Sequence, residues 1–336
     1  MKKSVLTILS FLILSCSTDA DNTTPDFENV TNSAPVITVK TISVAEHLPP
    51  GAAIGSIDAS DADNDEITFS VTSEEDLIIN EQTGELTVGA NLKLDFETTQ
   101  SIAFTVAVFD GETIVEQDFT LHVEDLDERI LLNEEQNALL SYFQFLAFWK
   151  GDNNIPVTRN QKWESPMTLY LEGSISAEFT ATVEGVLAQY NEIMSNGDFN
   201  ISLVQEVSAA NARLFFGSKA DLEGVWPDMF EQVKDGNFDG FAITPSQNSV
   251  LVGTRIWISN PAEVLLKHEL GHSLGFGHSN KCETENSFLC SQIQLTNDFL
   301  AIEEAIIRLM YDDKLAPGLT ELDFEKAVAN LLMNAL

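Results

Sequence analysis

Residues 268–278 read HELGHSLGFGH, and this stretch decides the fold expected for the second half of the chain. In a helix, His268 and His272 lie one turn apart on the same face, so both imidazoles can reach one metal ion. Gly275 can turn the chain sharply, which would let His278 complete the same site. Three nitrogen ligands leave one position open on zinc, as in catalytic rather than structural zinc sites.

Glu269 follows the first histidine and is placed to accept a proton from water at the metal rather than to bind the metal. The alternative is an amphipathic core helix with incidental histidines, but the glycine and the third histidine at their offsets favour the metal site. The segment resembles the metzincin zinc peptidases, and His278-Ser279 is most similar to the matrixin branch. The resemblance implies zinc ligands at His268, His272 and His278 and a general base at Glu269.

The metzincin resemblance also implies an apolar floor beneath the metal, which in that family is a methionine downstream of the third histidine. Matrixin-like spacing puts Leu289 in this position. Met310 is the other candidate, but residues 302–309 carry an apolar stripe that runs into it at helical spacing, as in a core helix. We therefore expect Leu289 to form the floor.

The length and charge of the chain limit its organisation and its partners. A chain of 336 residues predicts about two domains. Its 53 acidic and 17 basic residues give a net charge of −36, which argues against nucleic acid or an anionic membrane as a partner. This charge fits a well-solvated extracellular surface and leaves carboxylates free for hard cations such as calcium.

The N-terminus has the features of an export signal. Lys2 and Lys3 precede an apolar run, residues 5–14, that is too short to span a bilayer. Residues 12–16 read LILSC and resemble a bacterial lipobox, which implies a signal peptide at 1–15 and a lipid on Cys16. Residues 16–33 are polar and acidic, as in a flexible tether. We expect an outer-membrane lipoprotein of a Gram-negative bacterium that touches the membrane only through its lipid; ordinary secretion is the alternative.

Cys282 and Cys290 are the only cysteines after Cys16. An even pair in an exported chain predicts a disulfide, which here would hold the loop beside His278. Two unpaired thiols, or Cys290 as a metal ligand, are the alternatives.

Residues 34–126 alternate between apolar and polar side chains. Segments rich in β-branched and aromatic residues, at 36–39, 67–71, 86–88, 102–108 and 119–123, are separated by turn residues. About seven short strands in roughly ninety residues predict an all-β sandwich.

This region resembles a cadherin repeat. The motifs are VAE at 44–46, DAD at 61–63, TGEL at 83–86, LDFE at 94–97 and VFD at 108–110. The resemblance implies one calcium site with Glu46, Glu97, Asp125 and Asp127, and carboxylates for a second at the other end, from Asp61, Asp63 and Asp110. The linker VEDLDE lacks the family's asparagine and proline, and only one repeat is present, so these acids could also be solvated loop residues.

Residues 127–336 change to mixed helix and strand patterns, which predict an α/β (α+β) fold. A strand at 167–171, a helix at about 178–194 and further strands at 199–204, 212–216, 238–244 and 250–258 precede the histidine segment. Ser259 or Asn260 is expected to cap the histidine helix, with Pro261 in its first turn. The order is similar to the metzincin N-terminal subdomain, in which an edge strand holds extended substrate.

These patterns favour an exported zinc metallopeptidase that acts on protein or peptide substrates, with zinc and calcium as the expected metals. The rival is a non-enzymatic surface protein that binds through the sandwich and keeps the zinc fold as a scaffold. Glu269 argues against the rival, because a purely structural zinc site needs no base.

Overall fold

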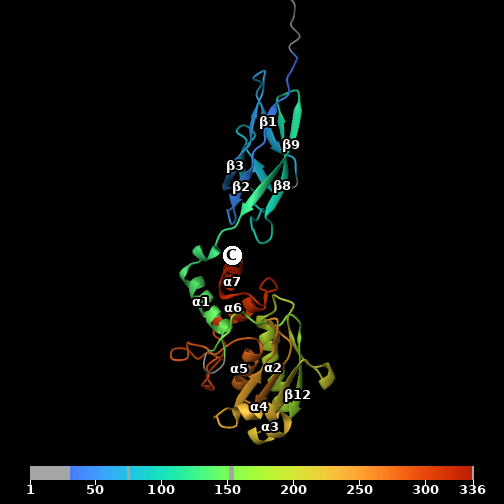
Figure 1. Ribbon diagram of the computed structural model, residues 1–336. Helices are drawn as coiled ribbons and strands as arrows, with labels where there is room; N and C mark the ends of the chain where they lie inside the picture. Colours follow the sequence, from blue (N-terminus) through green and yellow to red (C-terminus); the bar gives the residue numbers. More distant parts are fainter. Residues whose placement is uncertain (1–30, 74–75, 151–154, 335–336) are drawn as a thin grey trace, which may run out of the picture. The chain divides into compact units, whose positions relative to one another are not determined.

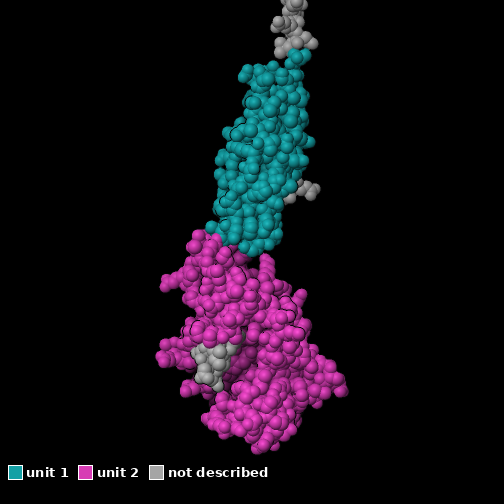
Figure 2. Space-filling view, viewed as in Figure 1, with its two compact units in different colours: residues 1–126 teal, residues 127–336 magenta. Residues whose placement is uncertain are grey.

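The computed structural model describes residues 31–73, 76–150 and 155–334 (Figure 1). The chain divides into two compact units, unit 1 at Met1–Leu126 and unit 2 at Asp127–Leu336, which Figure 2 colours separately. Cys16, the expected signal peptide and most of the expected tether lie outside the described residues.

The regular elements in the described residues of unit 1 are all strands. They are β1 (Val36–Thr38), β2 (Ile42–Ala45), β3 (Ala53–Ser56), β4 (Asp58–Ser60), β5 (Thr68–Val71), β6 (Leu77–Ile79), β7 (Glu85–Val88), β8 (Ser101–Phe109) and β9 (Ile114–Glu124). One sheet has the order β2-β9-β8-β5 and the other β3-β7-β6, while β1 pairs with β4. β2 runs parallel to β9, and the other pairs are antiparallel.

The core of unit 1 lies between its two sheets. Phe104, Val106, Phe119 and Leu121 from the long β8–β9 hairpin are buried together with Leu86 of β7. Every second residue of these strands points inward, which is why the alternation is visible in the sequence. The predicted all-β sandwich is confirmed.

Unit 2 mixes helices and strands. The helices are α1 (Glu134–Phe148), α2 (Ala177–Ile193), α3 (Lys219–Val225), α4 (Pro227–Val233), α5 (Glu263–Ser273), α6 (Ala301–Met310) and α7 (Glu321–Asn334), with 3-10 turns η1 (Glu128–Ile130) and η2 (Val207–Ala209). The strands are β10 (Trp149–Lys150), β11 (Ile155–Pro156), β12 (Met167–Gly173), β13 (Ile201–Leu203), β14 (Ala212–Phe216), β15 (Gly240–Ile243), β16 (Ser246–Gln247), β17 (Val250–Leu251) and β18 (Thr254–Ile258).

Five of these strands form one sheet with the order β13-β12-β14-β18-β15. The first four are parallel, and β15 is an antiparallel edge strand. Leu169, Leu214 and Ile256 share a core with α2 and α5, whereas Phe215 and Trp257, which alternate with them, pack with α3 and α4. Helices therefore cover both faces of the sheet, as expected when successive side chains of a strand point to opposite faces.

The histidine helix begins later than expected. Its first residue is Glu263, and the extended Ala262 precedes it, so Pro261 lies outside the first turn. The side-chain oxygen of Asn260 accepts a hydrogen bond from Ala262 N at 3.1 Å. This hydrogen bond lies within the turn that precedes the helix, so the Asn260 side chain does not cap the helix itself.

Candidate metal centre

The end of α5 brings the third histidine back to the helix. Gly275 has φ +97°, its N–H donates to His272 O at 3.0 Å, and Phe276 N donates to Gly271 O at 3.1 Å. This pair of bonds is the Schellman motif, which reverses the chain after a helix. A Cβ at Gly275 would also lie 2.4 Å from Gln161 O, so glycine is required for conformation and for space.

The three histidines converge. His268 Nε2 and His272 Nε2 are 2.9 Å apart, and His272 Nε2 and His278 Nε2 are 3.2 Å apart. Tetrahedral zinc with Zn–N bonds of about 2.0–2.1 Å requires nitrogens about 3.3 Å apart. The three imidazoles therefore fit a zinc ion at nearly their present positions.

Hydrogen bonds fix which ring nitrogens face the shared point. His268 Nδ1 lies 2.9 Å from Phe288 O, and His272 Nδ1 lies 2.9 Å from Phe276 O. A backbone carbonyl only accepts, so each Nδ1 carries the proton and each Nε2 keeps its lone pair for a metal. Burial, with a smaller effect of His278, lowers the pKa of His268 to about 4. The ring is thus neutral at pH 7, as a ligand must be.

A turn at residues 287–290 packs against the histidine helix. A Cβ at Gly271, between the two helical histidines, would lie 2.7 Å from Leu289 Cδ2, so Leu289 packs directly on the helix. Leu289 O also accepts from Ser279 N at 2.9 Å. Met310 is the buried last residue of α6, a core helix as predicted.

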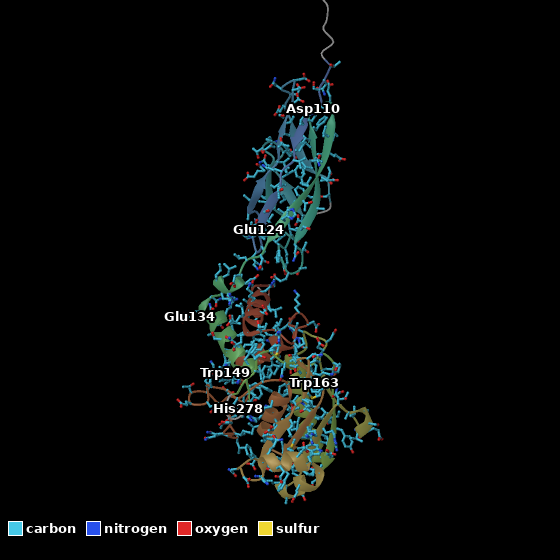
Figure 3. The ribbon with its side chains drawn as sticks, viewed as in Figure 1. Asp110, Glu124, Glu134, Trp149, Trp163 and His278 are labelled. Atoms are coloured by element: carbon cyan, nitrogen blue, oxygen red, sulfur yellow. A yellow bond between two sulfur atoms is a disulfide. The ribbon has the colours of Figure 1, made fainter. Side chains whose placement is uncertain are left out.

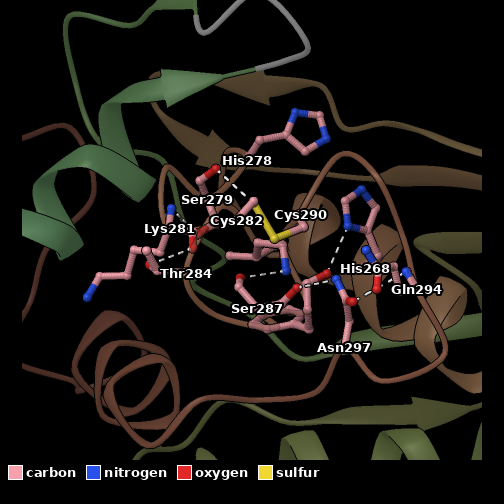
Figure 4. Close-up of a disulfide and its surroundings, with 12 residues drawn as sticks. His268, His278, Ser279, Lys281, Cys282, Thr284, Ser287, Cys290, Gln294 and Asn297 are labelled. Atoms are coloured by element: carbon pink, nitrogen blue, oxygen red, sulfur yellow. Dashed lines mark hydrogen bonds between the residues drawn. A yellow bond between two sulfur atoms is a disulfide. The ribbon is translucent and has the colours of Figure 1, made fainter.

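Cys282 and Cys290 form a disulfide, as predicted, and it closes the loop between Ser279 and the Leu289 turn (Figure 4). Trp149 lies near the same segment, because a Cβ at Gly277 would collide with Trp149 O (Figure 3). His278 is therefore held by the disulfide loop on one side and by the end of α1 on the other.

A cavity of about 710 Å³ opens beside the histidines. It is lined by the triad, by Glu269, by edge strand β15 and by residues 291–295. Among the described residues that line it, none is lysine or arginine, and the carboxylates are Asp239 and Glu269. Glu269 is itself largely buried, and it lies against Gly240 of β15. The arrangement can bind one metal ion, place a carboxylate beside it and receive an extended chain along β15.

Unit 1 carries two groups of carboxylates that could hold a cation. Ligand oxygens of Glu46, Asp95 and Glu97 lie within 4.8 Å of one another, and so do those of Asp61, Asp63 and Asp65. Asp110 and Glu124 mark opposite ends of the unit (Figure 3). Glu46 N donates to Glu124 O, which puts the first group at the Glu124 end.

The second group lies near Asp110. The Asn32 side chain donates to Asp110 Oδ2 at 3.0 Å, and the next residue, Ser33, donates its N–H to Asp63 Oδ2 at 2.7 Å. Hydrogen bonds, first from Thr113 N, lower the pKa of Asp110. The three residues expected at this end are therefore brought to one region, although Asp110 is not a member of the Asp61 group.

Neither of the two expected linker ligands belongs to a carboxylate group found among the described residues. Asp127 belongs to unit 2, where its carboxylate pairs with Arg129 at 2.6 Å, and Asp125 is exposed and belongs to neither group found among the described residues. Asp95 and Asp65 belong to these groups but were not among the residues expected from the sequence. Asp95 lies inside LDFE, two residues before Glu97, and Asp65 lies two residues after Asp63, so a search for carboxylates two residues apart could have found them.

No helix within residues 31–73, 76–150 or 155–334 is long and apolar enough to cross a bilayer. No curated protein matches the chain.

Comparison with known families identifies unit 1. The cadherin domain family model matches residues 40–124. Solved structures similar to the chain include human protocadherin-24 EC1-2, at 30% identity over 29% of this chain and 46% of that one, with a TM-score of 0.27. A second crystal form of human protocadherin-24 EC1-2 is 20% identical over 41% of this chain and 52% of that one, with a TM-score of 0.27. Protocadherin gamma B2 extracellular cadherin domains 1–5 are 28% identical over 28% of this chain and 19% of that one, with a TM-score of 0.24. The chain spans about half or less of the length of these structures, and its residues 40–124 form a cadherin domain.

Proposed function

We propose that the chain is an exported zinc-dependent endopeptidase of the metzincin type. The observation that carries the proposal is the convergence of three imidazole Nε2 atoms in residues that line one cavity together with Glu269 and edge strand β15. A structural zinc site has four protein ligands, whereas the described residues bring together three here, and these three line a cavity.

Each protein group has a separate task in hydrolysis. His268, His272 and His278 would hold a zinc ion, which would supply a Lewis acid that makes water nucleophilic near neutral pH. Glu269 takes a proton from the attacking water and delivers it to the leaving amine. Glu269 is largely buried and lines the same cavity as the three histidines.

Edge strand β15 positions the substrate. No strand within the described residues pairs with its outer side, so the backbone N–H and C=O groups there can pair with an extended peptide. Main-chain pairing recognises any extended polypeptide, which fits an endopeptidase acting on protein or peptide substrates.

The substitution Glu269→Gln tests this function, because glutamine keeps the shape but cannot accept the proton. The zinc-loaded parent should cleave members of a proteome-derived peptide mixture, and the variant should bind zinc equally and cleave at least a hundredfold more slowly. Cleavage by the variant at the parent rate would show that Glu269 is not the base.

The cadherin domain favours a second candidate, a surface protein that binds a partner through unit 1 and uses the zinc fold as a scaffold. A parent chain that binds zinc but cleaves nothing in the peptide mixture would favour this candidate. We also propose calcium binding at the two carboxylate groups of unit 1, and anchoring of the exported chain to an outer membrane through a lipid on Cys16.

A further inference from the structure

A buried carboxylate lies outside the histidine triad. Glu303, in the first turn of α6, is 1% exposed. Its Oε1 accepts from Tyr142 Oη at 2.7 Å and from Ser287 Oγ at 2.5 Å, and its Oε2 accepts from Leu300 N at 3.1 Å. A buried charge is stable only when it is well hydrogen-bonded, and here three donors from separate segments meet it.

One of these bonds leads to the third metal ligand. The phenol of Tyr142 has one proton, which it gives to Glu303, so Ser279 Oγ donates to Tyr142 Oη across 2.7 Å. Ser279 Oγ in turn accepts from Lys281 N at 3.0 Å. Ser279 directly follows His278, so the chain of hydrogen bonds from Glu303 fixes the backbone that carries this histidine.

The other bond leads to the turn beneath the metal. Ser287 Oγ, held by Glu303, accepts from Leu289 N at 3.0 Å, and Ser287 O accepts from the Asn297 side chain at 2.7 Å. These contacts set the turn in which Phe288 O receives the ring proton of His268. Glu303 therefore holds, through one oxygen atom, the supports of His268 and His278.

We propose that Glu303 is a positioning residue for the metal centre. It fixes the position of His278 through Tyr142 and Ser279, and the position of His268 through Ser287. It contacts neither metal ligand directly. The inference rests on the proposed zinc site, but not on peptide hydrolysis. Some residues orient the ligating histidines without binding the metal themselves. Their removal typically weakens metal binding by about 10–100-fold.

The test uses zinc affinity, measured on the full chain by competition with a chromogenic chelator, together with the melting temperature. In Glu303→Gln, the amide nitrogen faces either the Leu300 N–H or the two hydroxyl donors, so at least one bond is lost. We expect zinc affinity to fall about tenfold to a hundredfold. Tyr142→Phe keeps the ring packing and removes the hydroxyl that joins Glu303 to Ser279, but it leaves the Glu303–Ser287 bond, so it should weaken zinc binding by a smaller factor.

The control is Leu222→Ala, because Leu222 is fully buried in the separate core on the α3–α4 face of the sheet. It should lower the melting temperature and leave zinc affinity at the parent value. The inference is overturned if Tyr142→Phe and a folded Glu303→Gln both bind zinc as the parent does, if Leu222→Ala weakens binding as much, or if the parent binds no zinc. A parent that binds zinc but cleaves no peptide would contradict the peptidase while this result stands.

Discussion

Gly240 leaves no room for a side chain beside Glu269. A Cβ built on Gly240 would lie 2.4 Å from Glu269 Oε1 and 2.9 Å from its Cδ and Cγ. The backbone of edge strand β15 therefore lies directly against the side chain of the proposed base. A substrate paired with β15, as proposed, would therefore lie at a fixed distance from this carboxylate.

Gly240→Ala should therefore displace Glu269 and impair hydrolysis without removing a zinc ligand. A displacement of about 1 Å in a catalytic group can reduce the rate about a hundredfold. We expect this loss in kcat, with zinc affinity unchanged, in peptide-cleavage assays. Gly224→Ala is the matched control, because a Cβ there meets nothing within 4 Å and alanine favours the α3 helix. Equal activity in both variants would mean that Glu269 can move without cost.

Substitutions can show whether Leu289 or Met310 forms the apolar floor beneath the metal. Leu289→Ala opens a cavity under Gly271, so we expect a loss of about 2–5 kcal/mol in stability and a zinc affinity about tenfold weaker. Leu289→Met conserves volume and should bind zinc within a few-fold of the parent. Met310→Ala, at a fully buried position of α6, should destabilise the fold to a similar extent but leave zinc affinity unchanged. If Met310→Ala weakens zinc binding more than Leu289→Ala does, Met310 is the floor.

The parts of the site that are local in sequence could be predicted, and the parts that depend on distant pairing could not. The spacing of His268, His272 and His278 follows from one helical turn and one glycine. The contact of Glu303 with Tyr142 joins residues 161 positions apart and leaves no local pattern. The same limit applies to Gly240 and Glu269, which meet only because β15 pairs with β18 beside α5.

Short elements were also missed. α3 and α4 have seven residues each, which is too short for a helical period to be distinguished from a loop, yet they cover one face of the sheet. In unit 1, by contrast, side chains alternate along strands of up to eleven residues, so the all-β fold could be predicted.

Calcium should stabilise unit 1 alone. With dissociation constants of about 10⁻⁴–10⁻³ M, as in extracellular modules, 10 mM calcium would add roughly 1–3 kcal/mol. The four tryptophans and four tyrosines all lie in unit 2, so calorimetry of the full chain can follow unit 1 while tryptophan fluorescence follows unit 2. Asp95→Asn with Glu97→Gln should reduce the calcium effect, and Asp61→Asn with Asp63→Asn tests the other group. An effect of equal size from magnesium, or a shift in the unit 2 transition, would contradict selective calcium sites in unit 1.

The pair of Asp127 and Arg129 should make the stability of unit 2 depend on acid pH. The hydrogen bond from the Arg129 side chain lowers the pKa of Asp127 from 3.8 to about 2, and Arg129 also pairs with Glu325 of α7 at 2.9 Å. Because the folded pKa is below the unfolded one, this contribution is complete above about pH 4 and is lost as the pH falls through 2.

Asp127 is about one-third exposed, so the contribution should be about 1 kcal/mol or less. Asp127→Asn should be less stable than the parent by this amount at pH 6, and the difference should disappear near pH 2. Urea unfolding followed by tryptophan fluorescence measures it, with Asp125→Asn in the presence of a calcium chelator as the exposed control. A difference that stays constant from pH 6 to pH 2 would mean that Asp127 acts through packing, because only the loss of its charge makes the effect depend on pH.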